Sequence, residues 1–302
     1  TIYIHRRNTR VGDVMSNFTD FIGGGSSASQ INEIVTLSNT ADTVTLSDER
    51  VYLKGGLVAA PSTYPLAATS LRYLGTNFSV GSQMTTPQAI AWDGTHFWVV
   101  GSTTDQVFKY TAAGVYTGTS FSVSSQENSP SGIVWDGSYF WVIGTSQRTA
   151  FKYSSAGTYQ NVSFSAASQD SVTRGITWDG TSFWVLGDAT QRVYKYNASG
   201  VYQNVSWSTG TQGADAFDIT WDGTSFWVAN DNYNTIDKYN ASGVYQSNFS
   251  VSTEEIYLTG VLAKGGNLYV VGEQNDTVFE YAPAVGISAV SNLGGLNYVR
   301  VV

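Results

Sequence analysis

Apolar and polar positions repeat along most of this chain with a period of 43 residues. Each copy has a short apolar segment that ends in Trp, then Asp-Gly, then a run such as residues 97–100 in which every position is apolar. Four consecutive copies place the same residue at Trp92, Trp135, Trp178 and Trp221. A fixed period of about 40 to 50 residues is typical of a propeller or a solenoid.

Each copy predicts four short antiparallel strands, which we name a to d in chain order. In the first close copy they cover residues 90–92, 97–100, 107–110 and 115–123. Asp-Gly between strands a and b is a strong hairpin signal. Strand b is apolar on both faces, as expected for a strand between stacked sheets, whereas strand d is mostly Ser, Thr and Asn. An apolar interior and a polar outer strand are what a propeller blade needs.

The copies number six when the two weakest are counted. A degenerate copy starts near Ala41, where residues 44–56 align with the later repeats at an offset of 46. Four close copies follow, and a sixth starts near Gly260 and stops at Pro283, before a fourth strand. We therefore predict an all-β fold, a six-bladed β-propeller of four-stranded antiparallel blades.

Ring closure requires a strand from elsewhere, because the sixth copy has no strand d. Residues 31–37 directly precede the first copy, and we predict that they complete the sixth blade, since closure removes exposed edges. The predicted organisation is an N-terminal arm at 1–40 that anchors the protein and closes the ring, a propeller at 41–283, and a C-terminal strand at 284–302. We expect this last strand to pair with residues 1–7.

Composition excludes several classes of function. The net charge of −8 argues against a nucleic-acid partner, because phosphate neutralisation needs clustered Lys and Arg, and against an anionic membrane surface. The 302 residues include no Cys, which excludes disulfides and thiolate metal sites, and no apolar run long enough to cross a bilayer. No apolar segment follows the basic residues Arg6, Arg7 and Arg10, so we expect no signal peptide and synthesis in the cytoplasm.

The sequence offers little for catalysis. His5 and His96 are the only histidines, so no Ser/His/Asp arrangement is credible, and no set of His, Asp and Glu has metal-ligand spacing. The repeated Asp of Asp-Gly is first of all a turn former, and the repeated Trp residues are expected to pack between blades. We therefore predict that the chain is not an enzyme and has no catalytic residue, no metal site and no cofactor.

The loops fall into two sets that differ in variability. The a–b and c–d turns are nearly identical in the four close copies, whereas the b–c and d–a loops differ from copy to copy. Because successive strands run in opposite directions, the b–c and d–a loops share one face of the disc, which we call the loop face. The uniform turns share the other, the turn face. Diverse loops on a rigid scaffold usually carry recognition; neutral drift in unconstrained loops is the alternative interpretation.

The loop face supplies the candidate binding residues. Tyr and Arg often anchor interfaces, and we select the large charged or aromatic side chains of these loops. The candidates are Arg148, Arg174, Arg192, Asp215, Asp231 and Tyr233.

A resemblance to a known family lies in the repeat itself. The motif WDGTxFWVxG followed by VYKYNASGVYQNVSFS resembles the propeller repeats of tail-fibre and other virion proteins of tailed bacteriophages. The resemblance covers residues 44–281, and the closing segment GLNYVRVV resembles the endings of such proteins. It implies a virion structural protein in the adsorption apparatus, in contact with a receptor on the bacterial surface. It implies no particular binding residue, because no site motif belongs to the repeat.

The resulting expectation is a non-enzymatic virion protein of the tail-fibre or receptor-binding type, which contacts the host through its loop face. Its expected partners are other virion proteins, copies of itself in a homo-oligomer or multi-copy assembly, and a host cell-surface glycan or protein. Neither nucleic-acid binding nor membrane insertion is expected. Many copies on one particle would turn weak contacts into firm adhesion.

Three other classes of function are compatible with the same fold. A capsid decoration or structural spacer would use the uniform turn face and the flanking segments equally well. A carbohydrate-binding propeller lectin would need equivalent pockets in several blades, whereas the loops differ between blades. A propeller hydrolase or lyase is disfavoured by the shortage of histidine and by the absence of a repeated acid outside the Asp-Gly turns.

Overall fold

The computed structural model describes residues 2–4, 33–35, 50–53, 56–59, 70–210, 215–231, 233–251, 254–255, 257–284, 287–293 and 296–301. Regular secondary structure within these ranges is entirely β. The chain divides into two compact units, one made of Leu71–Pro283 and the other of Thr1–Ser70 together with Ala284–Val302.

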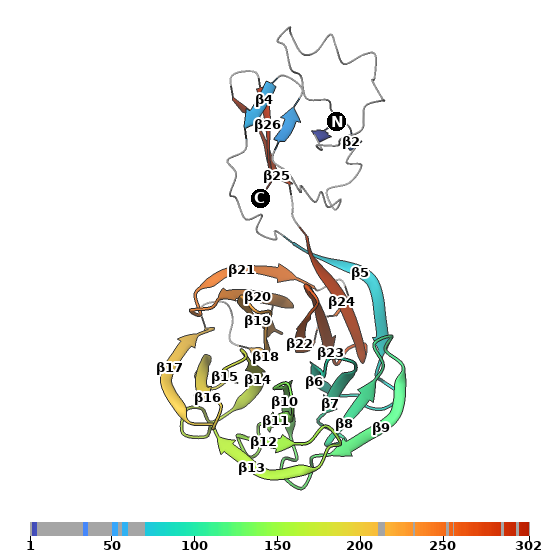
Figure 1. Ribbon diagram of the computed structural model, residues 1–302, viewed down its shortest axis with the longest axis vertical. Helices are drawn as coiled ribbons and strands as arrows, with labels where there is room; N and C mark the ends of the chain where they lie inside the picture. The colour runs from blue at the N-terminus through green and yellow to red at the C-terminus, as the bar shows by residue number, and fades with distance from the viewer. Residues whose placement is uncertain are drawn as a thin grey trace. The chain divides into compact units, whose positions relative to one another are not determined.

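The larger unit is a β-propeller of five blades, each a four-stranded antiparallel sheet (Figure 1). Blade 1 consists of β6 (Pro87–Trp92), β7 (Phe97–Gly101), β8 (Gln106–Tyr110) and β9 (Tyr116–Ser122), and blade 2 of β10 (Pro130–Trp135), β11 (Phe140–Gly144), β12 (Thr149–Tyr153) and β13 (Tyr159–Ser165). Blade 3 consists of β14 (Thr173–Trp178), β15 (Ser182–Gly187), β16 (Arg192–Asn197) and β17 (Tyr202–Ser208), and blade 4 of β18 (Ala216–Trp221), β19 (Ser225–Asn230), β20 (Thr235–Asn240) and β21 (Tyr245–Ser250). Blade 5 consists of β22 (Leu258–Lys264), β23 (Asn267–Gly272), β24 (Thr277–Ala284) and β5 (Ser70–Ser79). In Figure 1 the first strand of each blade surrounds the centre of the ring, and the last strand lies at its perimeter.

The prediction of four-stranded antiparallel blades is confirmed, and the prediction of six blades is wrong. The degenerate copy at residues 44–56 forms no blade. Its β3 (Arg50–Leu53) belongs to a separate sheet of order β2-β1-β3-β4, with β1 (Ile2–Ile4), β2 (Glu33–Val35) and β4 (Gly56–Ala59). The physical reason lies in the pairing of β5. This strand has the pattern of the strand d of the degenerate copy, but it pairs with β24 and completes blade 5, so the copy has no strand d left for a sixth blade.

Blade 5 is closed by β5, and the predicted closure by residues 31–37 is wrong. β5 pairs with β24, so a strand that precedes the first blade completes the last sheet. β2, which lies within 31–37, pairs instead with β1. β5 has the sequence of a strand d, and it completes blade 5 because that sheet would otherwise keep an exposed edge.

The C-terminal residues form a separate two-stranded sheet. β25 (Ile287–Leu293) pairs with β26 (Leu296–Val301) in antiparallel register. The expected pairing of the C-terminal strand with residues 1–7 is therefore wrong, since the partners of β1 are β2 and β3.

Aromatic side chains of strand b join neighbouring blades. Every residue of β7 and β11 is buried, as the apolar runs predict. The ring centroid of Trp98 in β7 lies 4.8 Å from that of Phe140 in β11, and the same contact recurs from Trp141 to Phe183 and from Trp184 to Phe226. The predicted packing of tryptophans between blades is confirmed at these positions.

The c–d turns of blades 1 to 4 bring a glycine against an aromatic ring of the preceding blade. Gly157 has a φ of +80°, and a Cβ atom there would lie 2.2 Å from Cγ of Phe121. Gly114 approaches the ring of Phe78 in β5 in the same way. The closing strand β5 therefore packs against the c–d turn of the next blade as the other strands d do. Only glycine allows the backbone to approach a ring so closely at a positive φ.

Gly157→Ala is expected to lower the free energy of unfolding by about 3 kcal/mol or more, because a steric clash with Phe121 adds to the strain of a positive φ. Gly118→Ala is the matched control: φ is also +80° at Gly118, but a Cβ atom there meets nothing within 4 Å. This control should lose only about 1–2 kcal/mol. Urea denaturation of both variants measures the difference, and equal losses would contradict a tight contact between the turn and the ring.

Phe78→Ala is expected to destabilise the propeller by about 2–4 kcal/mol, because it removes a large side chain from a packed contact. The Phe78 ring lies 5.4 Å from that of Phe97 and 5.5 Å from that of Tyr110, both in blade 1. Thr76→Ala, at an exposed position of the same strand, is the control and should change stability by no more than about 0.5 kcal/mol. If thermal melting shows similar shifts for both, β5 does not hold the ring closed.

Candidate functional site

The turn face repeats one polar arrangement in blades 1 to 4. Asp93 accepts hydrogen bonds from the backbone N–H of Thr95 (2.8 Å) and of His96 (2.7 Å), and from Nε1 of Trp98 (2.7 Å). Nζ of Lys109 lies 5.1 Å from the centroid of the Trp98 ring. The corresponding residues of the next blades are Asp136, Trp141 and Lys152; Asp179, Trp184 and Lys195; and Asp222, Trp227 and Lys238. The interpretation of the repeated aspartates as turn formers is confirmed.

These hydrogen bonds also fix the charge of the turn aspartates. Burial raises the pKa of Asp93, but the hydrogen bonds from Trp98, Thr95 and His96 outweigh it and bring the pKa below its ordinary value. The pKa values of Asp179 and Asp222 are lowered by the same balance. These carboxylates stay ionised and brace the turns.

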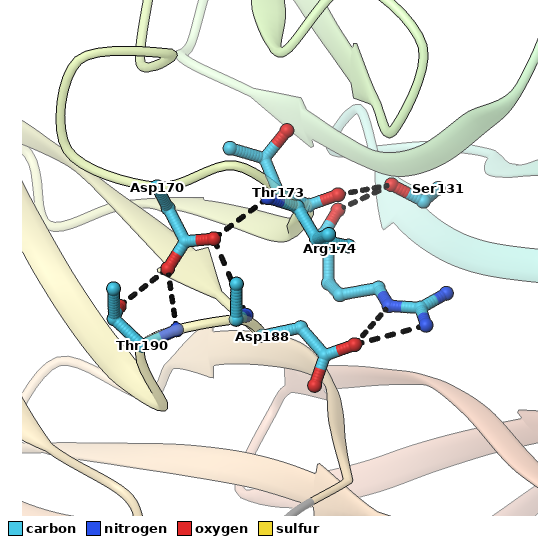
Figure 2. A network of polar contacts seen from close by, with 8 residues as sticks. Ser131, Asp170, Thr173, Arg174, Asp188 and Thr190 are labelled. Atoms are coloured by element: carbon cyan, nitrogen blue, oxygen red, sulfur yellow. Dashed lines mark hydrogen bonds and ion pairs between the residues drawn. The ribbon is translucent and has the colours of Figure 1, made fainter.

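Buried carboxylates fasten the diverse loops of the loop face to one another. Glu127, in the d–a loop after blade 1, is buried and accepts hydrogen bonds from the N–H groups of Ser129 and of Gln147 in the b–c loop of blade 2, both at 2.9 Å. Burial raises the pKa of Glu127, and these hydrogen bonds oppose the rise. Asp170 links the next pair of loops in the same way (Figure 2), and Glu255 does so before blade 5. The loops therefore hold fixed positions although their sequences differ.

Arg174 lies at the start of β14, the innermost strand of blade 3, on the loop face. Its Nε and Nη2 atoms donate hydrogen bonds to Oδ2 of Asp188 at 3.1 and 3.0 Å (Figure 2). Its guanidinium carbon lies 4.4 Å from the centroid of the Phe217 ring, at the start of β18 in blade 4. The guanidinium is thus held between a carboxylate and an aromatic ring, and Asp188 neutralises its charge.

Two of the other candidates, Asp215 and Asp231, meet where the loops of blades 4 and 5 adjoin, and a third, Tyr233, lies two residues after Asp231 in the chain. The N–H of Asp231 donates to the carbonyl oxygen of Asp215 at 3.0 Å, and Oδ1 of Asp231 accepts a hydrogen bond from the N–H of Leu258 at 2.9 Å. Tyr233 and Tyr257 are close in sequence to the two ends of this second bond, and they are 59% and 54% exposed. We call Asp215, Asp231, Tyr233, Tyr257 and Glu273 the tyrosine junction.

Burial and neighbouring negative charge raise the pKa of two carboxyl groups of the tyrosine junction, those of Asp231 and Glu273. Burial raises the pKa of Asp231; the hydrogen bond from Leu258 opposes the rise and the charge of Asp215 adds to it. Burial also raises the pKa of Glu273; a hydrogen bond of 2.5 Å from Nε2 of Gln88 opposes the rise, and the charge of Asp231 adds to it. The junction therefore favours ligands that donate hydrogen bonds or carry positive charge.

The remaining two candidates lie elsewhere on their blades. Arg192 is on β16, where its Nη2 donates to Oγ of Ser206 on β17 at 2.8 Å and so braces the outer edge of blade 3. Arg148 occupies a left-handed corner of the b–c loop of blade 2, with a φ of +52°. Between the described side chains, no hydrogen bond or ion pair links either residue to the tyrosine junction.

Blade 4 buries two carboxyl groups at positions that are apolar in the other blades. Asp218, 2% exposed, lies on β18 where the other innermost strands have Gly or Ala, and its Oδ2 accepts a hydrogen bond from the N–H of Val261 at 3.0 Å. Burial raises the pKa of Asp218 well above its ordinary value. Asp237 on β20 accepts hydrogen bonds from Asn230 at 3.3 Å and Thr235 at 3.1 Å, and burial raises its pKa to about 6.

Three residues of the site were missed from the sequence. Asp188 and Phe217 take the repeat positions of Ser102 and Gln88 in blade 1, so a comparison of the copies position by position would have marked them as divergent. Tyr257 precedes the one copy that is a residue short. The missing residue shifts the alignment of this copy with the others, so the repeat position of Tyr257 was not recognised.

The described part of the chain contains no group of three or more His, Asp or Glu side chains placed to hold a metal ion. Nor does it contain a helix long and apolar enough to cross a membrane.

Known structures share this fold at low sequence identity. The glutaminyl cyclase of Myxococcus xanthus has a TM-score of 0.58 at 10% identity, over 70% of this chain and 95% of that enzyme. A virginiamycin B lyase from Staphylococcus aureus (TM-score 0.44, 14% identity, 78% and 88% covered) and a calcium-binding regucalcin from Agrobacterium tumefaciens (0.43, 15%, 66% and 76%) are less similar. The sequence matches no protein-family model and no curated protein. Likeness at this identity shows the propeller fold alone.

From fold and composition we predicted that the chain is not an enzyme, and this prediction is wrong. The glutaminyl cyclase is an enzyme built on a propeller of this kind, so this architecture does not exclude catalysis. The likeness to the glutaminyl cyclase supports the propeller fold that the resemblance implies, and that enzyme is not a virion protein.

Asp237→Asn is expected to stabilise the protein above pH 6 and to have little effect near pH 4. The pKa of Asp237 rises from 3.8 to about 6 on folding. Between these two pH values the folded state binds more protons than the unfolded state, so the stability of the natural protein falls as the pH rises through this window. At pH 8 the variant should gain up to about 3 kcal/mol over the natural protein. Denaturant unfolding at several pH values measures this, and an equal difference at pH 4 and pH 8 would contradict it.

Proposed function

We propose that this protein is a receptor-binding component of a tailed-phage virion, of the tail-fibre type, and that it contacts the host cell through its loop face. The phage origin rests on the repeat, whose resemblance to virion propellers covers residues 44–281. The contact surface rests on one observation, the exposure of Tyr233 and Tyr257 in the tyrosine junction.

The exposure of these two side chains is exceptional in this chain. Among the residues whose side chains the structure describes, every other Phe, Tyr and Trp side chain is buried or half-buried, and Tyr233 and Tyr257 alone are more than half exposed. Both come from the loop face: Tyr257 directly precedes Leu258 in the chain, and Tyr233 lies two residues after Asp231, the hydrogen-bond partner of Leu258. Exposed tyrosines among polar groups are typical of binding surfaces, because a Tyr side chain offers a large rigid contact area and a hydroxyl group.

The junction occurs once in the ring. The repeat positions of Tyr233 and Tyr257 hold Thr104 and Thr86 in blade 1, and no other blade has an aromatic residue at either position. This asymmetry favours a single binding site in each chain over a lectin with equivalent pockets in several blades. Firm adhesion would then come from several copies on one particle.

Hydrogen bonds from backbone N–H groups tie the described residues of the junction together. Glu255 accepts one from the N–H of Tyr257, and Asp231 accepts one from the N–H of Leu258. Residues that are held in place before a partner binds lose less conformational entropy on binding, which strengthens the interaction.

Purified protein is expected to block adsorption of the phage that carries it, because it occupies the same receptor. The double variant Tyr233→Ala/Tyr257→Ala should lose most of this effect, since loss of two anchor side chains costs on the order of tenfold or more in affinity. The matched control Val201→Ala/Val244→Ala removes two side chains of similar exposure, 58% and 56%, from the turn face and should block adsorption fully.

Antibody labelling of intact particles tests the proposed location. Label at the tail tip, together with blocked adsorption, supports the receptor-binding function. Label on the head shell with normal adsorption would contradict it and would favour a capsid decoration.

A further inference from the structure

The turn face carries a sequence whose backbone can rearrange without an enzyme. Asp-Gly occurs there in four blades, as Asp93-Gly94, Asp136-Gly137, Asp179-Gly180 and Asp222-Gly223. In this reaction the backbone nitrogen of the glycine attacks Cγ of the protonated aspartic acid. The N–Cγ bond forms, the bond from Cγ to one carboxyl oxygen breaks, and that oxygen leaves as water with the acid proton and the amide proton.

Water then opens the five-membered imide ring that has formed. It adds to the main-chain carbonyl carbon of the aspartate, the bond from this carbon to the glycine nitrogen breaks, and the nitrogen regains a proton. The product is isoaspartate, in which the main chain runs through Cγ and is one carbon longer. The water released in the first step is returned in the second, so the reaction needs no other reactant.

The glycine side of each turn is open to this reaction. Gly94 is exposed, its φ is +99°, and a Cβ atom added there would meet nothing within 4 Å. A positive φ and open space recur at the glycines of the next three blades, Gly137, Gly180 and Gly223. Crowding by neighbouring atoms therefore does not protect these turns.

The carboxyl side is held by hydrogen bonds to both oxygens. Oδ1 of Asp93 accepts from the N–H groups of Thr95 and His96, and Oδ2 accepts from Nε1 of Trp98. Whichever oxygen leaves, the hydrogen bonds to it must break. The donors also stabilise the carboxylate over the protonated acid that the reaction requires. The same three bonds hold the aspartates of the next blades, Asp136, Asp179 and Asp222.

We propose that the four Asp-Gly turns are latent sites of isoaspartate formation, kept unmodified by an indole N–H of strand b together with two backbone N–H groups of each turn. The indoles are those of Trp98, Trp141, Trp184 and Trp227. This inference is independent of the proposed function. Isoaspartate would lengthen the hairpin turn and move the carboxylate to another carbon, so the hydrogen bonds that hold the turn also preserve its covalent structure.

Among these four turns, that of blade 2 has one hydrogen bond fewer in the structure. The hydroxyl groups of Thr95, Thr181 and Thr224 each donate to Oδ1 of their turn aspartate, at 2.8, 2.7 and 2.8 Å. Ser138 takes this position in blade 2, and its hydrogen bond to Asp136 comes from the backbone N–H. We therefore expect Asp136 to be the most reactive of the four aspartates.

The direct test follows isoaspartate at each Asp-Gly pair of the purified full chain during storage at neutral pH. Peptide mass spectrometry with electron-transfer fragmentation distinguishes isoaspartate from aspartate. Each pair should react at least about a hundredfold more slowly in the folded protein than in concentrated guanidinium chloride, because hydrogen bonds to a charged group are strong and must break. Asp136 should react severalfold faster than the other three. Equal rates in the folded and the unfolded chain would overturn the proposal.

Two substitutions in blade 1 test the hydrogen bonds separately. Trp98→Phe removes the indole N–H and should speed the reaction at Asp93 on the order of tenfold. Thr95→Ala, at an exposed position, removes only the hydroxyl group and should speed it severalfold. The other three pairs are controls within the same chain and should react as in the natural protein. An unchanged rate at Asp93 in these variants would contradict the proposal.

Two further variants separate protection of the turn from stability of the fold. Lys109→Ala removes the cation over the Trp98 ring but keeps the indole N–H, so the rate at Asp93 should not change. Ser138→Thr supplies the missing hydroxyl group in blade 2 and should slow the reaction at Asp136 severalfold. If Trp98→Phe speeds all four pairs alike, or if Lys109→Ala speeds Asp93 as much, general loss of folding explains the effect and the role given to the indole N–H is overturned.

Discussion

The stacking of each sheet on the next is the interaction on which the rest of this structure depends. Strand b is buried on both faces, so one blade contributes to two cores: Val99 of blade 1 packs in a cluster with Val271 of blade 5, and Val100 packs in a cluster with Val142 of blade 2. An isolated blade would expose one of these faces to water. The apolar surface is fully buried only when every blade has a neighbour on each side, which requires a closed ring.

Closure accounts for the path of the chain through the propeller. The chain enters the ring at β5 and leaves it at β24, and these two strands pair in blade 5. The Tyr73 ring lies 5.8 Å from the rings of both Phe279 and Tyr281, so the closing strand is held by packing as well as by the ladder. The first and last strands of the propeller, which are far apart in sequence, thus stabilise one another.

The two faces of the ring are under different constraints. Each a–b turn of blades 1 to 4 places an Asp, a Trp and a Lys together, as Asp93, Trp98 and Lys109 do, and this leaves little room for change. On the loop face, three pairs of loops are each tied by one buried carboxylate, that of Glu127, Asp170 or Glu255, which bonds to backbone N–H groups and so constrains few other side chains. The other loop positions can vary, and in blades 4 and 5 this variation has produced exposed tyrosines beside a group of acids.

The sequence by itself determined the blade: the period, the Asp-Gly hairpin, the two-sided burial of strand b and the division into a uniform and a diverse face. Each of the four close copies carries these features as a local pattern of residues, so they can be recognised without knowing which blades are neighbours. Tertiary structure alone decided the number of blades and the closing strand, because residues 73–80 have the pattern of a strand d whichever sheet they join, and only the open edge of blade 5 selects their partner. It also decided which loop residues meet. Arg174 was recognisable as a candidate, but its contact with the Phe217 ring depends on how blade 4 packs against blade 3, which no local pattern encodes.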